Sequence, residues 1–269
     1  MKKGKNVICF ILAILVCLGM SGCTPFWRAE KVKIKVYEKV GQLFILNLEQ
    51  LDNSKGDFYE HRKMTDIMKS TIEQYHVGGV ILFSRNIKSR KQTVKLNADL
   101  QSASQIPLFI AVDEEGGDVA RIASNEKMKT TAFPSAEEIG KTKDDEYTYQ
   151  MAKTIGTEIG ELGFNVDFAP VADVKISELN AEIGNRSFGN EPEEVAKHVS
   201  AFVQGLQNVG ISSTLKHFPG QGSSNGDTHV DSVDIDSSIS GLRNVDFRDA
   251  GPLGGHQLLR QTADRRHGA

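Results

Sequence analysis

A chain of 269 residues that is 39% hydrophobic and 25% charged is long enough for one domain with a sizeable core. Its formal net charge of −3 and the lack of a basic stripe argue against binding to nucleic acid. All three cysteines (Cys9, Cys17 and Cys23) lie near the N-terminus, so the rest of the chain has no thiol for disulfides, metal binding or nucleophilic catalysis.

Residues 1–22 are predicted to be a signal peptide. Three lysines precede an apolar run at residues 7–20, which is short for a membrane span. The run ends in MSGC (residues 20–23), which resembles the lipobox of bacterial lipoproteins. That resemblance implies cleavage before Cys23, lipid attachment to its thiol, and anchoring on the outer face of the bacterial cytoplasmic membrane. A plain secretory signal or an uncleaved anchor is the alternative.

After a short basic tether at residues 23–35, apolar strands are predicted to alternate with amphipathic helices. The predicted strands are residues 40–48, 77–83, 106–113, 163–174 and 210–215, and the predicted helices are residues 64–75, 89–102, 147–162 and 193–209. Near-continuous apolar strands separated by such helices indicate a parallel sheet covered by helices.

Polar residues stand at the carboxyl ends of these strands, namely Arg85, Asp113, Asp173 and the pair Lys216-His217. A (β/α)8 TIM-type barrel builds its active site from such strand ends. The alternative, a doubly wound open sheet, binds ligands at one switch point. We therefore predict an α/β barrel domain over residues 36–247, incomplete, with about five β/α units recognisable.

Residues 248–269 do not continue this pattern. They contain four arginines but no Lys, Ile, Val or aromatic residue, and they show neither helix nor strand periodicity. We interpret them as an aberrant end produced by a frameshift or by a wrongly assigned end near Phe247, with a disordered tail as the alternative.

Ionisable side chains gather in the stretch that follows the fifth predicted strand. Lys216 and His217 end the strand, and a Gly/Ser/Asn-rich loop then carries Asp227 and His229. Catalytic residues commonly collect on such loops. A solvated surface loop is the plain alternative. A metal site built from His217, Asp227 and His229 is another, although no HExxH or CxxC pattern supports it.

Two further polar loops follow earlier strands. Residues 113–121 (DEEGGDVAR) combine Asp113, two glycines and Arg121, a set suited to a ligand rich in hydroxyl groups; alternatively, Asp113 could cap the next helix. Residues 184–189 (GNRSFG) carry Arg186, which could instead pair with Glu182 or Glu191.

Together these segments resemble glycoside hydrolase family 3, and within it the β-N-acetylglucosaminidase branch. The matching segments are residues 113–121, 167–173 (DFAPVAD), 184–189, 216–222 (KHFPGQG) and the pair Asp227-x-His229. The Asp-x-His pair distinguishes this branch from the β-glucosidase branch of the family. Gln221 departs from the pattern, because the family usually has His there, and Asp118 stands where Arg or Lys is frequent.

The resemblance implies a retaining hydrolysis of terminal β-linked N-acetylglucosamine in muropeptides or other cell-wall glycans, without a metal or organic cofactor. It implies that His229 is the general acid/base and that Asp227 orients it. The residues that it implies for binding the hydroxyls and N-acetyl group of the terminal sugar are Asp113, Arg121, Arg186, Lys216 and His217.

The family's nucleophile is an Asp on a later barrel strand, and we find no nucleophile in this chain. We therefore expect the 269-residue chain to be poorly folded and inactive. Two other functions stay open. One is a non-catalytic sugar-binding lipoprotein, and the other is a different family 3 activity, such as a β-glucosidase or β-xylosidase.

Overall fold

The computed structural model describes residues 35–177, 180–218 and 220–224. All of these except Lys35 belong to the second of the two units into which the chain divides, Met1–Lys35 and Val36–Ala269. The predicted signal peptide, Cys23, Asp227, His229 and the aberrant end at residues 248–269 lie outside the described residues.

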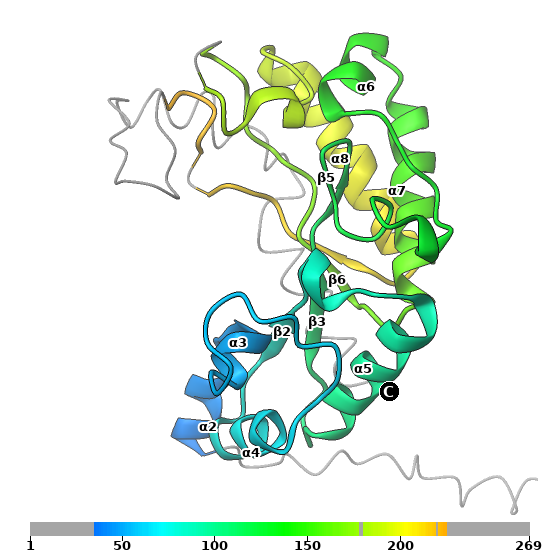
Figure 1. Ribbon diagram of the computed structural model, residues 1–269. Coiled ribbons are helices and arrows are strands. Elements are labelled where there is room, and N and C mark those ends of the chain that lie inside the picture. Colours follow the sequence, from blue (N-terminus) through cyan, green and yellow to red (C-terminus); the bar gives the residue numbers. More distant parts are fainter. Residues whose placement is uncertain (1–34, 178–179, 219, 225–269) are drawn as a thin grey trace, which may run out of the picture. The chain divides into compact units, whose positions relative to one another are not determined.

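A five-stranded parallel sheet forms the centre of the second unit (Figure 1). Its strands are β1 (Ile45–Asn47), β2 (Gly79–Ile81), β3 (Phe109–Val112), β6 (Val166–Asp167) and β7 (Ser212–Ser213). Each strand pairs in parallel with the next one along the chain. A doubly wound sheet would reverse this order at a switch point, so the sequential order confirms the predicted barrel architecture. Across the described residues the sheet does not close on itself.

The long helices match the predicted ones closely. They are α4 (Asp66–Tyr75), α5 (Arg90–Ser102), α7 (Asp145–Gly160) and α8 (Pro192–Asn208). Thr65, Ser89 and Asp144 cap the first three through their side-chain oxygens, and Pro192 starts the fourth, where its missing N–H leaves no bond unmade. None of the helices in the described part of the chain is long and apolar enough to cross a membrane.

Shorter elements fill the connections. They are α2 (Val36–Gly41), α3 (Leu48–Leu51), α6 (Ala136–Thr142), the 3₁₀ turns η2 (Ser84–Asn86), η3 (Glu126–Met128) and η4 (Gly184–Arg186), and the antiparallel hairpin β4 (Glu114–Gly116) and β5 (Val119–Ala120). Because β4 follows Asp113 directly, the alternative in which Asp113 caps a helix is wrong.

The predicted strands were too long. Residues predicted to begin the first strand belong instead to α2, where Gly41 packs so closely that a Cβ there would lie 1.9 Å from Tyr75 O. In the fourth predicted strand, residues 163–174, only Val166 and Asp167 pair as a strand. Pro170 has no N–H to donate to a ladder, and beyond it only Val171 makes a further bridge, to Lys216.

Helices α7 and α8 pack against each other at glycine contacts. A Cβ on Gly205 of α8 would lie 2.5 Å from Tyr149 O and 2.8 Å from Ala152 Cβ of α7. Such a close approach leaves no room for even one methyl group. Ile155, Phe202 and Leu206 are fully or almost fully buried around this contact.

We predict that Gly205→Ala lowers the free energy of unfolding by about 1–3 kcal/mol, because the added methyl group overpacks the α7–α8 contact. Urea denaturation followed by circular dichroism measures the change. Gly160→Ala is the matched control, since a Cβ there would be no closer than 3.4 Å to a neighbouring atom. An equally stable Gly205→Ala protein would contradict the packing account.

Candidate active site

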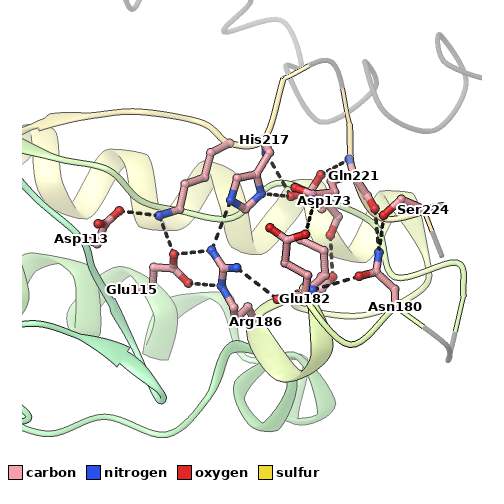
Figure 2. A network of polar contacts seen from close by, with 12 residues as sticks. Asp113, Glu115, Asp173, Asn180, Glu182, Arg186, His217, Gln221 and Ser224 are labelled. Atoms are coloured by element: carbon pink, nitrogen blue, oxygen red, sulfur yellow. Dashed lines mark hydrogen bonds and ion pairs between the residues drawn. The ribbon is translucent and has the colours of Figure 1, made fainter. Parts of the chain in front are cut away.

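Charged side chains from three strand ends meet in one network (Figure 2). Asp113 follows β3, Asp173 lies beyond β6, and β7 leads into Lys216 and His217, whose connecting peptide bond is cis. Arg186 reaches the same place from η4. Since parallel strands point their carboxyl ends the same way, residues up to 103 positions apart are brought together.

Lys216 lies between two carboxylates. Its Nζ is 2.8 Å from Asp113 Oδ1 and 2.5 Å from Glu115 Oε1. All three side chains are largely buried, with 14% or less of each exposed. A lysine ammonium held in this way offers fixed donors, while the two carboxylates keep further acceptor positions for a ligand's hydroxyl groups.

Arg186 makes a two-pronged pair with Glu115. Its Nε and Nη2 lie 3.0 and 2.8 Å from the two Glu115 oxygens, and Nη1 donates to Glu182 O at 3.1 Å. Burial alone would lower the pKa of Arg186, but its hydrogen bonds to Glu115 and the nearby negative charges raise it. Arg186 thus forms its ion pair with Glu115, whereas its contact with Glu182 is a hydrogen bond to the main-chain oxygen.

His217 has protein partners at both ring nitrogens. Its Nδ1 lies 2.6 Å from Asp173 Oδ2, and its Nε2 lies 3.2 Å from Arg186 Nη2. A guanidinium has no acceptor, so Nε2 must accept and the ring proton must sit on Nδ1, from which it is donated to Asp173. The tautomer of His217 follows from this geometry.

Arg121 lies at the edge of the network. Its Nε is 3.9 Å from Asp113 Oδ2, and its main-chain N–H donates to Asp113 O at 3.3 Å. Within the described residues this Nε is buried and has no hydrogen-bond partner. This Nε is therefore a buried donor left without a hydrogen-bond acceptor, close to the Asp113 carboxylate.

The structure thus brings together all five described members of the predicted sugar pocket, Asp113, Arg121, Arg186, Lys216 and His217. Arg85, another strand-end residue, instead makes an ion pair with Glu49 at 2.5 Å. Asp227 and His229 lie outside the described residues, and within the described ranges no group of three or more His, Cys, Asp or Glu side chains could hold a metal ion.

Sequence reasoning missed Glu115 and Asp173 as site residues. Glu115 binds Lys216 and Arg186 at once, and Asp173 accepts from the His217 ring. Asp173 carried a signal, because it stood among the polar residues assigned to strand ends. Glu115 was visible only as one letter of the DEEGG segment, and its partners lie 71 or more residues away.

Two buried carboxyl groups support the hairpin that carries Arg121. Glu114 accepts from the main-chain N–H groups of Ile122 (2.7 Å) and Ala123 (2.9 Å), and Asp167 Oδ1 accepts from Glu114 N at 3.0 Å. Burial raises the pKa of Glu114 to about 7 in spite of its hydrogen bonds, and burial also raises the pKa of the fully buried Asp167 well above its ordinary value.

Glu114 should make stability depend on pH. Its folded-state pKa of about 7 lies above the ordinary value of 4.5, so the folded state holds this proton more tightly than the unfolded state. The resulting stabilisation is fully present below pH 4.5 and is lost as the pH rises to about 7, at a cost of roughly 3 kcal/mol.

We predict that Glu114→Gln removes this part of the pH dependence. Between pH 4.5 and 7.5, the free energy of unfolding of the unmodified protein should fall relative to that of the variant. Urea titrations at a series of pH values measure both curves. Parallel curves would mean that Glu114 does not titrate in this range.

Comparisons with known proteins give consistent results. The profile of the glycosyl hydrolase family 3 N terminal domain matches residues 35–249. Beta-hexosaminidase A of Pseudoalteromonas piscicida is 43% identical over 217 residues, which cover 76% of this chain and 35% of that protein. Beta-hexosaminidase of Xylella fastidiosa is 41% identical over 166 residues, which cover 59% of this chain and 48% of that protein.

Solved structures are similar as well. A glycoside hydrolase family 3 β-N-acetylglucosaminidase from Paenibacillus sp. matches with a TM-score of 0.72 and 33% identity, over 82% of this chain and 40% of that one. NagZ from Neisseria gonorrhoeae matches with a TM-score of 0.68 and 30% identity, over 78% of this chain and 60% of that one. This chain therefore spans between about a third and three fifths of the length of these relatives.

Proposed function

The chain belongs to glycosyl hydrolase family 3. From this membership we propose that it is, by descent, a retaining exo-β-N-acetylglucosaminidase. Its substrate would be terminal β-linked N-acetylglucosamine in cell-wall glycans or muropeptides. The names of its relatives, among them beta-hexosaminidases and a β-N-acetylglucosaminidase, support this substrate class.

The observation that carries the proposal is the array of fixed charges around Lys216. A pyranose presents neighbouring hydroxyl groups, each of which can donate one hydrogen bond and accept others. Asp113 supplies acceptors, while Lys216 and the partly exposed guanidinium of Arg121 supply donors beside it. Because Asp113 and Lys216 are paired with each other and largely buried, they are held in place before a ligand arrives, which lowers the cost of ordering them.

The chemical steps rest on residues outside the described part. We propose that His229 protonates the leaving oxygen and later activates water, and that Asp227 accepts from its other ring nitrogen and so fixes its orientation. An Asp on a later barrel strand would attack the anomeric carbon to form the covalent glycosyl intermediate. Asp113, Lys216 and Arg186 of the sugar pocket would hold the ring during both steps.

The proposal is tested by calorimetry and turnover measured separately. We expect the chain to bind N-acetylglucosamine more tightly than glucose. Hydrolysis of an aryl N-acetyl-β-glucosaminide would contradict the expected inactivity of this 269-residue chain. Preference for glucose or xylose would favour another family 3 activity. Absence of any sugar binding by a sample that circular dichroism shows to be folded would refute the proposed pocket.

We predict that Lys216→Met weakens N-acetylglucosamine binding by tenfold or more, because it removes a charged donor and leaves Asp113 and Glu115 without their shared cation. Isothermal titration calorimetry measures the loss. Lys95→Met is the matched control, since Lys95 is exposed on α5 and pairs with Asp99. Equal affinities for the two variants would show that Lys216 does not contact the sugar.

We also propose that lipid on Cys23 anchors the protein to the outer face of the bacterial cytoplasmic membrane. In a bacterium that processes lipoproteins, Cys23→Ser should move the protein from the detergent phase to the aqueous phase of a Triton X-114 partition. Mass spectrometry of the N-terminal peptide identifies the lipid directly. Detergent partition that survives Cys23→Ser would point to an uncleaved apolar anchor.

A further inference from the structure

Five residues of the site form a closed cycle of hydrogen bonds (Figure 2). Asp173 accepts from Gln221 N at 2.6 Å and from His217 Nδ1 at 2.6 Å, one on each carboxylate oxygen. Arg186 donates to His217 Nε2 at 3.2 Å and to Glu182 O at 3.1 Å. The side-chain amide of Gln221 donates to the Glu182 carboxylate and completes the cycle.

Gln221 links two loops, as the contact between His217 and Arg186 also does. It stands in the segment after β7, whereas Glu182 and Arg186 stand in the segment before α8. Asn180 adds a second link by donating from Nδ2 to Gln221 O at 2.7 Å. Gln221, Asn180 and Asp173 are each at most 6% exposed, so these bonds are made where water does not compete.

The main chain around Gln221 is equally constrained. A Cβ on Gly222 would lie 1.8 Å from Val174 O, so the loop rests directly on the chain that follows Asp173. Ile176 N also donates to Gly222 O at 3.1 Å. The Gln221 side chain therefore starts from a fixed backbone, and its amide is directed at Glu182.

We propose that Gln221 is a positioning residue that, by closing this cycle, fixes the His217 ring and the Arg186 guanidinium in place beside the pocket proposed to bind the sugar. The inference rests on the proposed sugar-binding function. The amide is suited to this place because it donates to Glu182 without carrying a charge. Asp173 thus remains the charged partner of His217, and Glu115 remains that of Arg186.

Reversing the Gln–Glu contact tests the proposal. Gln221→Glu places a second carboxylate against Glu182, so the two repel each other and the cycle opens. In the double variant Gln221→Glu/Glu182→Gln, the amide donates from the other side and the cycle closes again. If Gln221 mattered only for its size, the single and the double variant would behave alike.

The primary measurement is the state of the His217 ring in the full chain, labelled with ¹⁵N at histidine and assigned with a His217→Gln variant. Long-range ¹H–¹⁵N spectra separate a protonated ring nitrogen from an unprotonated one. We expect a single tautomer, protonated at Nδ1, in the unmodified protein and in the double variant. Gln221→Glu should shift or broaden these signals.

Affinity for N-acetylglucosamine is the second measurement, and we expect Gln221→Glu to weaken it about tenfold and the double variant to restore it. Gln150→Glu is the matched control, because Gln150 donates to Glu146 in an exposed amide–carboxylate pair on α7. The control should leave both readouts unchanged.

The outcomes separate the possibilities. Unchanged His217 signals in Gln221→Glu, or signals still disturbed in the double variant, would overturn the proposal. If Gln221→Glu does not fold, Gln221→Asn decides, since its shorter amide should not reach Glu182. A protein that shows the expected His217 signals but binds no sugar would refute the proposed function. It would still support the role of Gln221 in positioning His217.

Discussion

The pairing of Lys216 with two carboxylates is the interaction on which the site depends. Asp113 and Glu115 are largely buried, and each would pay a desolvation penalty of several kcal/mol as an isolated ion. Lys216 compensates both, and Arg186 adds a second cation to Glu115. Removing Lys216 would leave Glu115 with Arg186 alone, and Asp113 with Arg121 at 3.9 Å. The arrangement of the site therefore depends on charge pairing as well as on packing.

Other carboxyl groups near these ion pairs have different roles. Glu114 and Asp167 are buried, and burial raises the pKa of each. They act as acceptors for main-chain N–H groups and so hold the hairpin of Arg121 in place. Asp173, by contrast, accepts from both N–H groups of His217 and from Gln221 N. Neighbouring acids thus divide between supporting the backbone and orienting the side chains of the site.

The helices and the strand order could be predicted from the sequence because apolar periodicity and capping residues such as Thr65 and Ser89 are local signals. The ends of the strands could not be predicted, because an apolar run does not show where strand pairing stops. The strand β6, for example, ends at Asp167, before Pro170. Positions at strand ends predicted that Asp113 and Lys216 would meet. The choice of Glu115 as the partner of Arg186 is a contact between residues 71 positions apart, which no local pattern encodes.

The sequential order of the strands has a consequence for how the site is assembled during synthesis. Each strand pairs with the one made before it, so the sheet can grow as the chain emerges from the ribosome. The site cannot grow in the same way. Asp113 is made 103 residues before Lys216, and until β7 joins the sheet its carboxylate lacks that counter-ion. In the nascent sheet the Asp113 carboxylate therefore stays hydrated and negatively charged, until the strand β7 brings Lys216 next to it.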